Sequence, residues 1–343
     1  MKFLRNWFME LNILVTLKEK HFPAIVNDEA KAKLESLGNV SYRLELNSET
    51  SERGYSQTIA DSNTDIIVTC WDSPRLSYKI YQENPQIKYL CHVAGEVRPY
   101  VDLDCIKAGL LVSNWGKLIG KSVAEGALMM ILAALRRTTY FQMEMHIRKG
   151  WSGNRKPEGL LYQRIGLFGF GSIAQELVKL LQPFDCKIFA YDPFVADDVF
   201  ERLKVTRLNS VEQLFQTCRI ISVHAAKTPE THHIISKNLL SKLEDGGIII
   251  NTGRGAIIDT EALIDELKTG RIEAALDVFE MEPLEAKSEL RGIENCLLMP
   301  HLAGPTPDRW VDMGNLAVAN IENFINGREV LYSVPLEKYE LMT

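Results

Sequence analysis

The sequence has few cysteines and no long apolar run. Its six cysteines are scattered, and no two of them are close enough to form a CxxC pair. That pattern suggests neither a disulfide framework nor a zinc site, so we expect reduced thiols, a cytoplasmic location and no bound metal. Apolar runs such as residues 126–135 fall far short of the roughly 20 residues that cross a membrane, so no membrane association is expected.

The sequence also lacks an excess of positive charge. The formal net charge is −6, which supplies no basic surface for nucleic acid. Near the start of the chain, Lys2 and Arg5 are followed by apolar residues, but Glu10 and Asn12 interrupt them and no small-residue cleavage site follows. We therefore expect neither a nucleic-acid partner nor an export signal.

What the chain does contain is the composition of an ordinary globular protein. It has 343 residues, of which 46% are hydrophobic and 24% are charged, and this length allows two cores of normal domain size. In the first third, short apolar runs alternate with helical patterns, which predicts a parallel sheet covered on both faces. The predicted strands are residues 12–17, 65–70, 87–93 and 110–115.

The same alternation restarts after a polar, glycine-rich loop at residues 149–164. Strands are predicted from Ile165 and at residues 186–192, 219–225, 247–253, 272–279 and 296–300, with helices from Ser172 and at residues 260–270. This second doubly wound sheet has the size of one Rossmann domain. An amphipathic helix at residues 315–325 is too short to be a domain and is expected to pack on the first one.

A long helical pattern, residues 121–145, separates the two halves. It is apolar over much of its circumference, which a surface helix would not be. We expect one helix that is buried between domains or between subunits.

The second sheet opens with a glycine turn. The letters GFGSIA, residues 169–174, follow a predicted strand and begin a predicted helix. Gly169 fits the tight turn, Gly171 lets the backbone approach a pyrophosphate at the helix N-terminus, and Ala174 still allows close helix packing. A purely steric glycine turn is the alternative reading of this motif.

An acidic residue supports the nucleotide reading. Asp192 ends the next strand, about 20 residues on, where a carboxylate receives the ribose hydroxyls of a dinucleotide. Because this carboxylate would repel a 2′-phosphate, and no arginine or lysine follows it directly, the predicted cofactor is NAD rather than NADP.

Three segments at the expected carboxyl ends of strands supply groups for chemistry: residues 251–259, 275–283 and 299–306. Hydride transfer to a carbonyl also moves a proton, and His301 has a side chain suited to that step. Glu282 could fix the tautomer of the His301 ring by a hydrogen bond, and Arg254 could bind a substrate carboxylate. Spacing alone does not separate Glu282 from Glu280, and an isolated histidine at a strand end is more often a packed one.

These motifs in this order resemble the D-isomer-specific 2-hydroxyacid dehydrogenases, over nearly the whole chain. The resemblance implies an NAD-binding Rossmann domain at residues 114–305, inserted into a flavodoxin-like substrate domain made of residues 1–113 and 306–343. It also implies a homodimer formed through the nucleotide domain, with residues 121–145 as a dimer element. The segments that carry it are residues 12–16, 122–125, 169–174, 228–235, 251–259, 275–283 and 300–304.

The resemblance assigns roles to individual residues. His301 matches the proton donor and acceptor, Glu282 its acidic partner, and Arg254 the substrate-binding arginine. The expected cofactor-binding residues are Gly169, Gly171, Ser172, Ile173, Asp192, His224, Thr228, Thr252, Asp277 and Ala303. Asp277 matches the residue that holds the nicotinamide carboxamide, although it could instead cap the following turn.

The family also binds the substrate carboxylate with backbone amides of a loop, which here contains Ala94, Gly95 and Glu96. Glu96 departs from the commoner pattern, and an acid beside a carboxylate pocket is unfavourable unless it turns away or meets a cation. Trp71 is a further candidate for the substrate pocket, and an ordinary packed aromatic residue is the equal alternative.

The sequence therefore predicts an NAD-dependent oxidoreductase that interconverts a small D-2-hydroxy acid and its 2-keto acid. The alternative from another class is an NAD(H)-sensing, co-repressor-like binding protein on the same scaffold, because such proteins can retain the catalytic residues. A family enzyme with different chemistry, such as formate oxidation, is the third possibility.

Overall fold

The computed structural model describes residues 11–151 and 153–341, which fold as two units. Unit 1 comprises Met1–Leu118 and Pro307–Thr343, and unit 2 comprises Ile119–Thr306. The expectation about an export signal rests partly on residues 1–10, which lie outside the described residues. No helix in the described part of the chain is long and apolar enough to span a membrane.

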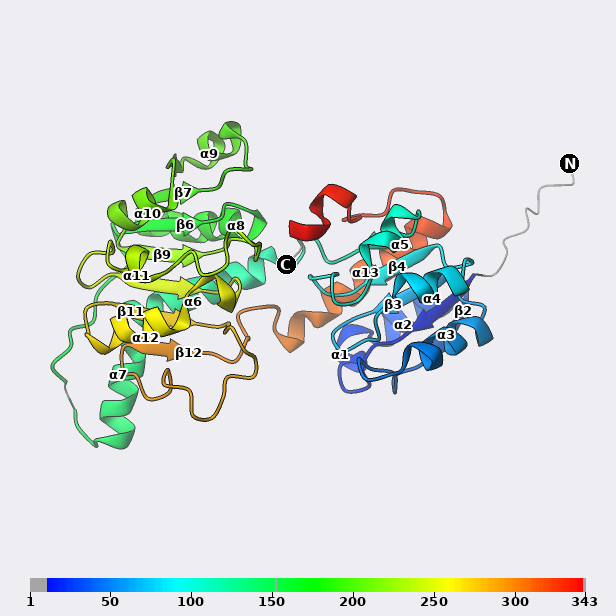
Figure 1. Ribbon diagram of the computed structural model, residues 1–343, viewed down its shortest axis with the longest axis horizontal. Helices are drawn as coiled ribbons and strands as arrows, with labels where there is room; N and C mark the ends of the chain where they lie inside the picture. The colour runs from blue at the N-terminus through cyan, green and yellow to red at the C-terminus, as the bar shows by residue number, and fades with distance from the viewer. Residues whose placement is uncertain (1–10, 152, 342–343) are drawn as a thin grey trace, which may run out of the picture. The chain divides into compact units, whose positions relative to one another are not determined.

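Unit 1 is built on a five-stranded parallel sheet in the order β2-β1-β3-β4-β5 (Figure 1). Its strands are β1 (Asn12–Val15), β2 (Asn39–Tyr42), β3 (Ile66–Thr69), β4 (Tyr89–His92) and β5 (Leu111–Ser113). Its helices are α1 (Phe22–Ile25), α2 (Asp28–Glu35), α3 (Glu52–Asp61), α4 (Tyr78–Glu83), α5 (Leu103–Lys107) and α13 (Trp310–Ile325), with 3-10 turns at Pro307–Arg309 and Leu336–Leu341.

The core of unit 1 follows from the alternation of side chains along its strands. Leu14, Ile67 and Leu90 face a core that contains residues of α3, α4 and α5. On α13, which returns from the far end of the sequence, Gly314 lies against α1: a Cβ there would be 1.8 Å from the carbonyl oxygen of Ile25. The expected helix at residues 315–325 is thus longer than predicted, and it packs in unit 1.

Unit 2 is a seven-stranded parallel sheet in the order β12-β11-β10-β9-β6-β7-β8, the doubly wound order with its reversal between β6 and β9. Its strands are β6 (Arg164–Phe168), β7 (Lys187–Tyr191), β8 (Thr206–Arg207), β9 (Ile220–Val223), β10 (Ile248–Asn251), β11 (Glu273–Leu276) and β12 (Cys296–Leu298). Its helices are α6 (Gly120–Leu135), α7 (Thr138–Gln142), a π-helix (Met143–Ile147), α8 (Ser172–Leu181), α9 (Asp197–Leu203), α10 (Val211–Thr217), α11 (Lys237–Leu240) and α12 (Thr260–Lys268), with 3-10 turns at Gln182–Phe184 and Gly255–Ile257.

Both faces of this sheet are covered, which explains why its strands are continuously apolar. Ile248 and Ile250 of β10 belong to the core shared with α6 and α8, whereas Ile249 belongs to the core shared with α10, α11 and α12. The predicted α/β class, with two doubly wound parallel sheets of Rossmann and flavodoxin-like order, is confirmed.

The expectation of a single helix over residues 121–145 is wrong. The α6 helix ends at Leu135, and Arg137 has a left-handed backbone with φ of 54° before α7 begins. Arg137 donates to Glu158, and its guanidinium also pairs with the buried carboxylate of Glu273 at 2.5 Å. These ion pairs fix the break, which hydrophobic periodicity does not reveal. Much of the apolar surface of α6 is buried in the core of its own unit.

Candidate active site

The glycine turn of unit 2 lies between β6 and α8, beside the reversal of strand order. Gly169 has φ of 90°, and a Cβ there would be 2.6 Å from the backbone nitrogen of Ala225. A side chain is therefore excluded at this position. At Gly171, which precedes the first residue of α8, a Cβ would meet no atom within 4 Å. The α8 N-terminus, with Ser172 and Ile173 in its first turn, is thus open to an approaching anion, as a pyrophosphate requires.

Asp192 follows β7 and is tied to this turn. Its carboxylate accepts hydrogen bonds from the backbone amides of Phe170 at 2.7 Å and Phe194 at 2.8 Å. One cation near it was missed from the sequence: Arg207 donates to the backbone carbonyl of Asp192 at 3.0 Å and pairs with Asp197. Arg207 comes from β8, the edge strand beyond β7, so only the strand order could have revealed it.

Other predicted cofactor residues lie at the carboxyl ends of β9 and β10. The Thr252 hydroxyl is buried and has no hydrogen-bond partner among the described residues, which suits a donor held for a ligand. The ring of His224 lies 2.9 Å from the Ser222 hydroxyl, and burial lowers the pKa of His224 to about 4, so the ring is neutral at physiological pH. Thr228 is part of a turn closed by hydrogen bonds with Thr231.

His301 and Glu282 form a hydrogen-bonded pair. The Nδ1 atom of His301 is 2.7 Å from Oε2 of Glu282, and about half of the His301 side chain is exposed. The hydrogen bond to Glu282 raises the pKa of His301, against the opposing effects of burial and of the Arg254 charge. Burial alone would raise the pKa of Glu282, but the hydrogen bond to His301 and other contacts hold it below its usual value.

Asp277 fixes the turn that carries this histidine. Its carboxylate accepts hydrogen bonds from the amides of Leu302 at 2.7 Å and Ala303 at 2.9 Å, and its backbone carbonyl accepts from the amide of His301. His301 itself has φ of 56°, a strained conformation for a residue with a side chain. These three bonds hold the backbone in that conformation.

Arg254 follows β10, at the start of the 3-10 turn Gly255–Ile257. Its guanidinium donates to the carbonyl of Gly253 at 2.8 Å, and its charge acts on the pKa of both Glu282 and His301. The structure therefore brings Arg254, Glu282 and His301 to one end of the sheet of unit 2. The second acid, Glu280, has other partners: it accepts from Thr260 and lies 3.1 Å from His233.

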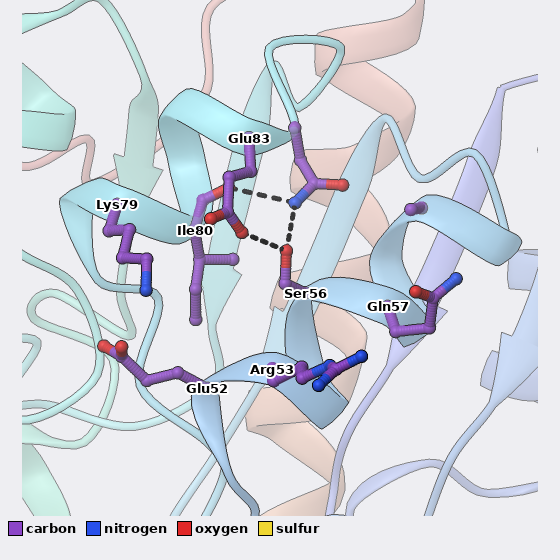
Figure 2. A pocket seen from close by; sticks show the side chains of 9 residues that line it. Glu52, Arg53, Ser56, Gln57, Lys79, Ile80 and Glu83 are labelled. Atoms are coloured by element: carbon purple, nitrogen blue, oxygen red, sulfur yellow. Dashed lines mark hydrogen bonds between the residues drawn. The ribbon is translucent and has the colours of Figure 1, made fainter.

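The structure has a pocket in each unit, and one of the two is lined by predicted site residues. A pocket of about 650 Å³ in unit 2 is bordered by His301 and Glu282 together with mostly apolar residues such as Phe279 and Met299. A pocket of about 380 Å³ in unit 1 lies between α3 and α4, where Ser56 and Glu83 point toward each other (Figure 2). The second pocket contains none of the predicted site residues.

In unit 1, the loop of residues 94–96 follows β4. Ala94 and Gly95 are buried, and the Gly95 carbonyl accepts a hydrogen bond from the Asn114 side chain at 2.6 Å. Glu96 does meet a cation: Arg98 donates to its carboxylate at 2.7 Å. Trp71 follows β3, and its ring centroid lies 5.3 Å from that of Trp310 and 6.0 Å from that of Trp115. Within residues 11–151 and 153–341, no three histidine, cysteine or acidic side chains are grouped as metal ligands would be.

Comparison with known proteins identifies the chain. The family described as "D-isomer specific 2-hydroxyacid dehydrogenase, NAD binding domain" matches residues 128–303, about half of the sequence. The chain belongs to the D-isomer specific 2-hydroxyacid dehydrogenase family. The resemblance predicted from the sequence motifs is thereby confirmed.

Sequence similarity to known relatives extends over most of the length of this dehydrogenase. It is 34% identical to a glyoxylate reductase of Thermofilum pendens, over 71% of this chain and 76% of that one. It is 32% identical to a hydroxypyruvate reductase of Thermotoga maritima, over 82% of this chain and 92% of that one. The crystal structure of a glyoxylate reductase from Paecilomyes thermophila has the same fold, with a TM-score of 0.81, 21% identity and coverage of 96% and 100%.

The family and the turn geometry agree on the cofactor. This dehydrogenase is an NAD-dependent oxidoreductase that acts on 2-hydroxy acids or their 2-keto acids, as was predicted. The Gly169–Gly171 turn, the Asp192 carboxylate and the Thr252 hydroxyl, which has no partner in the described part of the chain, fit an NAD molecule bound at the carboxyl ends of β6, β7, β9 and β10.

Proposed function

We propose that this dehydrogenase interconverts a small D-2-hydroxy acid and its 2-keto acid, with His301 as the proton donor and acceptor. The observation that carries the proposal is the 2.7 Å hydrogen bond between His301 Nδ1 and Glu282. That bond leaves Nε2 as the nitrogen that gives a proton to the carbonyl oxygen in reduction or takes it from the hydroxyl in oxidation. Bound NADH supplies the hydride for reduction, and bound NAD accepts it in oxidation.

The remaining residues have supporting roles in this proposal. Glu282 holds the His301 ring and stabilises its protonated form, while Arg254 binds the substrate carboxylate and polarises the reacting carbonyl. In unit 1, Trp71 borders the substrate, and the backbone amides of the loop bind its carboxylate. That loop contains Ala94, Gly95 and Glu96.

We also propose which residues of unit 2 contact the cofactor. The proposed contacts are Gly169, Gly171, Ser172, Ile173, Asp192, His224, Thr228, Thr252, Asp277 and Ala303. For Asp277 the carboxamide role would be additional to the two backbone hydrogen bonds that its carboxylate already accepts. A cytoplasmic location is proposed as well, in keeping with six free cysteines, five of them buried.

The test is turnover by the purified protein. NADH absorbance is followed against a panel of glyoxylate, hydroxypyruvate, pyruvate, phenylpyruvate and 2-ketoglutarate, with NADPH in parallel. We expect NADH oxidation with at least one acid, and a loss of kcat/KM of about 100-fold or more in His301→Ala, because a general acid contributes about that much.

A matched control separates catalysis from folding. The exposed His232→Ala variant should keep the activity, and His301→Ala should still bind NADH. Wild-type activity in His301→Ala would overturn the assignment of the proton donor. Tight NADH binding without turnover of any acid would favour an NAD(H)-sensing protein instead.

A further inference from the structure

Four aromatic side chains of unit 1 gather where ligands of open α/β sheets bind. The sheet order β2-β1-β3-β4-β5 reverses between β1 and β3, and the carboxyl edge at such a reversal is the usual ligand site. Trp71 lies two residues after the end of β3, Trp115 two residues after β5, and His21 six residues after β1. Trp310, the first residue of α13, joins them from the other end of the chain. We call His21, Trp71, Trp115 and Trp310 the aromatic cluster.

The rings of the aromatic cluster contact one another in a continuous series. The ring of Trp71 is central, with its centroid 6.0 Å from that of Trp115, 5.3 Å from that of Trp310 and 5.9 Å from that of His21. The centroids of His21 and Trp310 are 5.2 Å apart. All four side chains are only half-buried, so part of this aromatic surface stays accessible. Aromatic side chains that only pack in a hydrophobic core would be buried more completely.

The aromatic cluster adjoins the loop proposed to bind the substrate carboxylate. The backbone amide of Trp115 donates to the carbonyl of Ala94 at 3.1 Å. A Cβ on Gly95 would come within 2.6 Å of the Trp115 indole, so glycine is required for the loop to lie against that ring. A ligand whose carboxylate is held by this loop therefore has the indoles beside it.

The position of Trp71 is fixed by its neighbours. Asp72 has a left-handed backbone with φ of 66°, and its carboxylate accepts from Lys18 at 2.6 Å. The Ser73 hydroxyl accepts from the amide of Cys70 and donates to the carbonyl of Thr16. These bonds tie the turn after β3 to the residues after β1, so Trp71 is held in place before a ligand arrives. Such preorganisation is typical of a binding surface.

The surface offered by the aromatic cluster is uncharged. The Nδ1 atom of His21 is buried without a hydrogen-bond partner among the described residues, and burial together with Lys20 and Lys18 lowers the pKa of His21, which favours the neutral ring. Of the nearby cations, Lys18 and Arg98 each pair with a carboxylate, and Lys20 is exposed to solvent. A second carboxylate on the substrate would thus meet apolar rings, with two of the three nearby cations already paired.

We propose that the aromatic cluster binds the side chain of the 2-keto acid, and that this side chain is apolar and preferably aryl. This inference rests on the proposed function, because it names the substrate class of that reaction. Indole rings bind a flat apolar group through area burial and edge-to-face contacts. Glyoxylate has no side chain, so it would gain no binding energy from these contacts.

The first test compares substrates. With NADH as the reductant, we expect kcat/KM for phenylpyruvate to exceed those for glyoxylate and 2-ketoglutarate by about tenfold or more, the discrimination an apolar pocket provides. A preference for glyoxylate would mean that the aromatic cluster closes the pocket against side chains, and this would overturn the inference while leaving the proposed function intact.

The second test uses Trp71 variants. In Trp71→Ala, the ratio of kcat/KM for phenylpyruvate to that for glyoxylate should fall about tenfold, whereas Trp71→Phe should keep most of it. Tyr81→Ala, which removes a half-buried aromatic side chain of the same unit outside the aromatic cluster, is the control and should leave the ratio unchanged. An unchanged ratio in folded Trp71→Ala would also overturn the inference.

A binding measurement decides the case in which no acid is turned over. Phenyllactate binding in the presence of NAD is measured by saturation-transfer NMR for wild type and Trp71→Ala. Binding that is lost in the variant would support the aromatic cluster as a side-chain site even if the proposed reaction failed. If phenyllactate does not bind wild type and phenylpyruvate is not reduced, the inference is wrong.

Discussion

His301, the proposed proton donor and acceptor, is held in a backbone conformation that only its surroundings can maintain. With φ of 56°, it depends on the hydrogen bonds that Asp277 accepts from the turn, and its ring depends on Glu282. Asp277 therefore acts on the backbone of His301, while Glu282 acts on its ring. Substitutions of Asp277 and of Glu282 should therefore have different effects on the site.

A pH profile separates the role of Glu282. In the proposed reaction a protonated His301 is needed for reduction, so kcat/KM should fall as pH rises through its pKa, which the bond to Glu282 raises. In Glu282→Gln the carboxylate charge is lost, the pKa of His301 falls, and the descending limb should move to lower pH. The measurement is the pH dependence of kcat/KM in both proteins.

Glu280→Gln serves as the matched control for that experiment. Its carboxylate accepts from Thr260 and lies near His233 rather than His301, so its profile should follow that of wild type. A descending limb that stays in place in Glu282→Gln would show that His301 is not the titrating group.

Glu280 and Glu282 also show which part of the site could not be predicted from the sequence. Only Met281 separates them, and residue spacing assigns neither one to the histidine. Glu282 was selected only by family resemblance. The structure separates them because the chain turns at residues 279–283: the amide of Phe279 donates to Glu282, whereas Glu280 reaches back to the start of α12. Such a turn depends on contacts between segments far apart in sequence.

At the scale of elements, the first β-α-β segment of unit 2 was predictable almost completely. The apolar run, the two glycines and Asp192 have fixed spacings, and each is required by local geometry: the turn at Gly169, the open N-terminus of α8 and the end of β7. Edge elements were not predictable in this way. The two-residue strand β8 has no periodicity, and so the approach of Arg207 to Asp192 was missed.

The position of Arg207 beside Asp192 leads to a prediction about the choice between NADH and NADPH. In Asp192→Ser the negative charge facing a 2′-phosphate is removed while Arg207 remains close, so the ratio of kcat/KM for NADPH to that for NADH should rise about tenfold or more. Unit charges about 4 Å apart interact by about 1 to 4 kcal/mol at effective dielectric constants between those of water and a protein surface, which covers this change.

The control for cofactor choice is Asp198→Ser, which removes one exposed negative charge from the neighbouring helix α9. It should leave the ratio nearly unchanged. If Asp192→Ser binds both cofactors less tightly without any gain for NADPH, Asp192 only supports the turn through its bonds to Phe170 and Phe194.

For the whole molecule, the apolar composition of α6 and of the segment after it has two compatible explanations: burial within unit 2 and contact with another subunit. One face of α6 is buried in its own unit, through residues such as Ala127 and Ile131. Apolar side chains nevertheless remain exposed on α6 and on the segment after it, notably Met129 of α6 at 41%, Ile147 at 71% and Trp151 at 85%. Exposed apolar residues gathered in one stretch of chain are typical of a subunit interface.

The last prediction is therefore about assembly through this segment. We expect a homodimer, so light scattering after gel filtration should give twice the 38.9 kDa mass of the chain. Ile147→Asp would place a charge within the interface and should shift the mass toward that of one chain. Leu336→Asp, a change at a side chain of unit 1 that is 47% exposed, should remain dimeric. A monomeric wild type, or an Ile147→Asp protein that stays dimeric, would mean that the exposed residues around Ile147 do not form the interface.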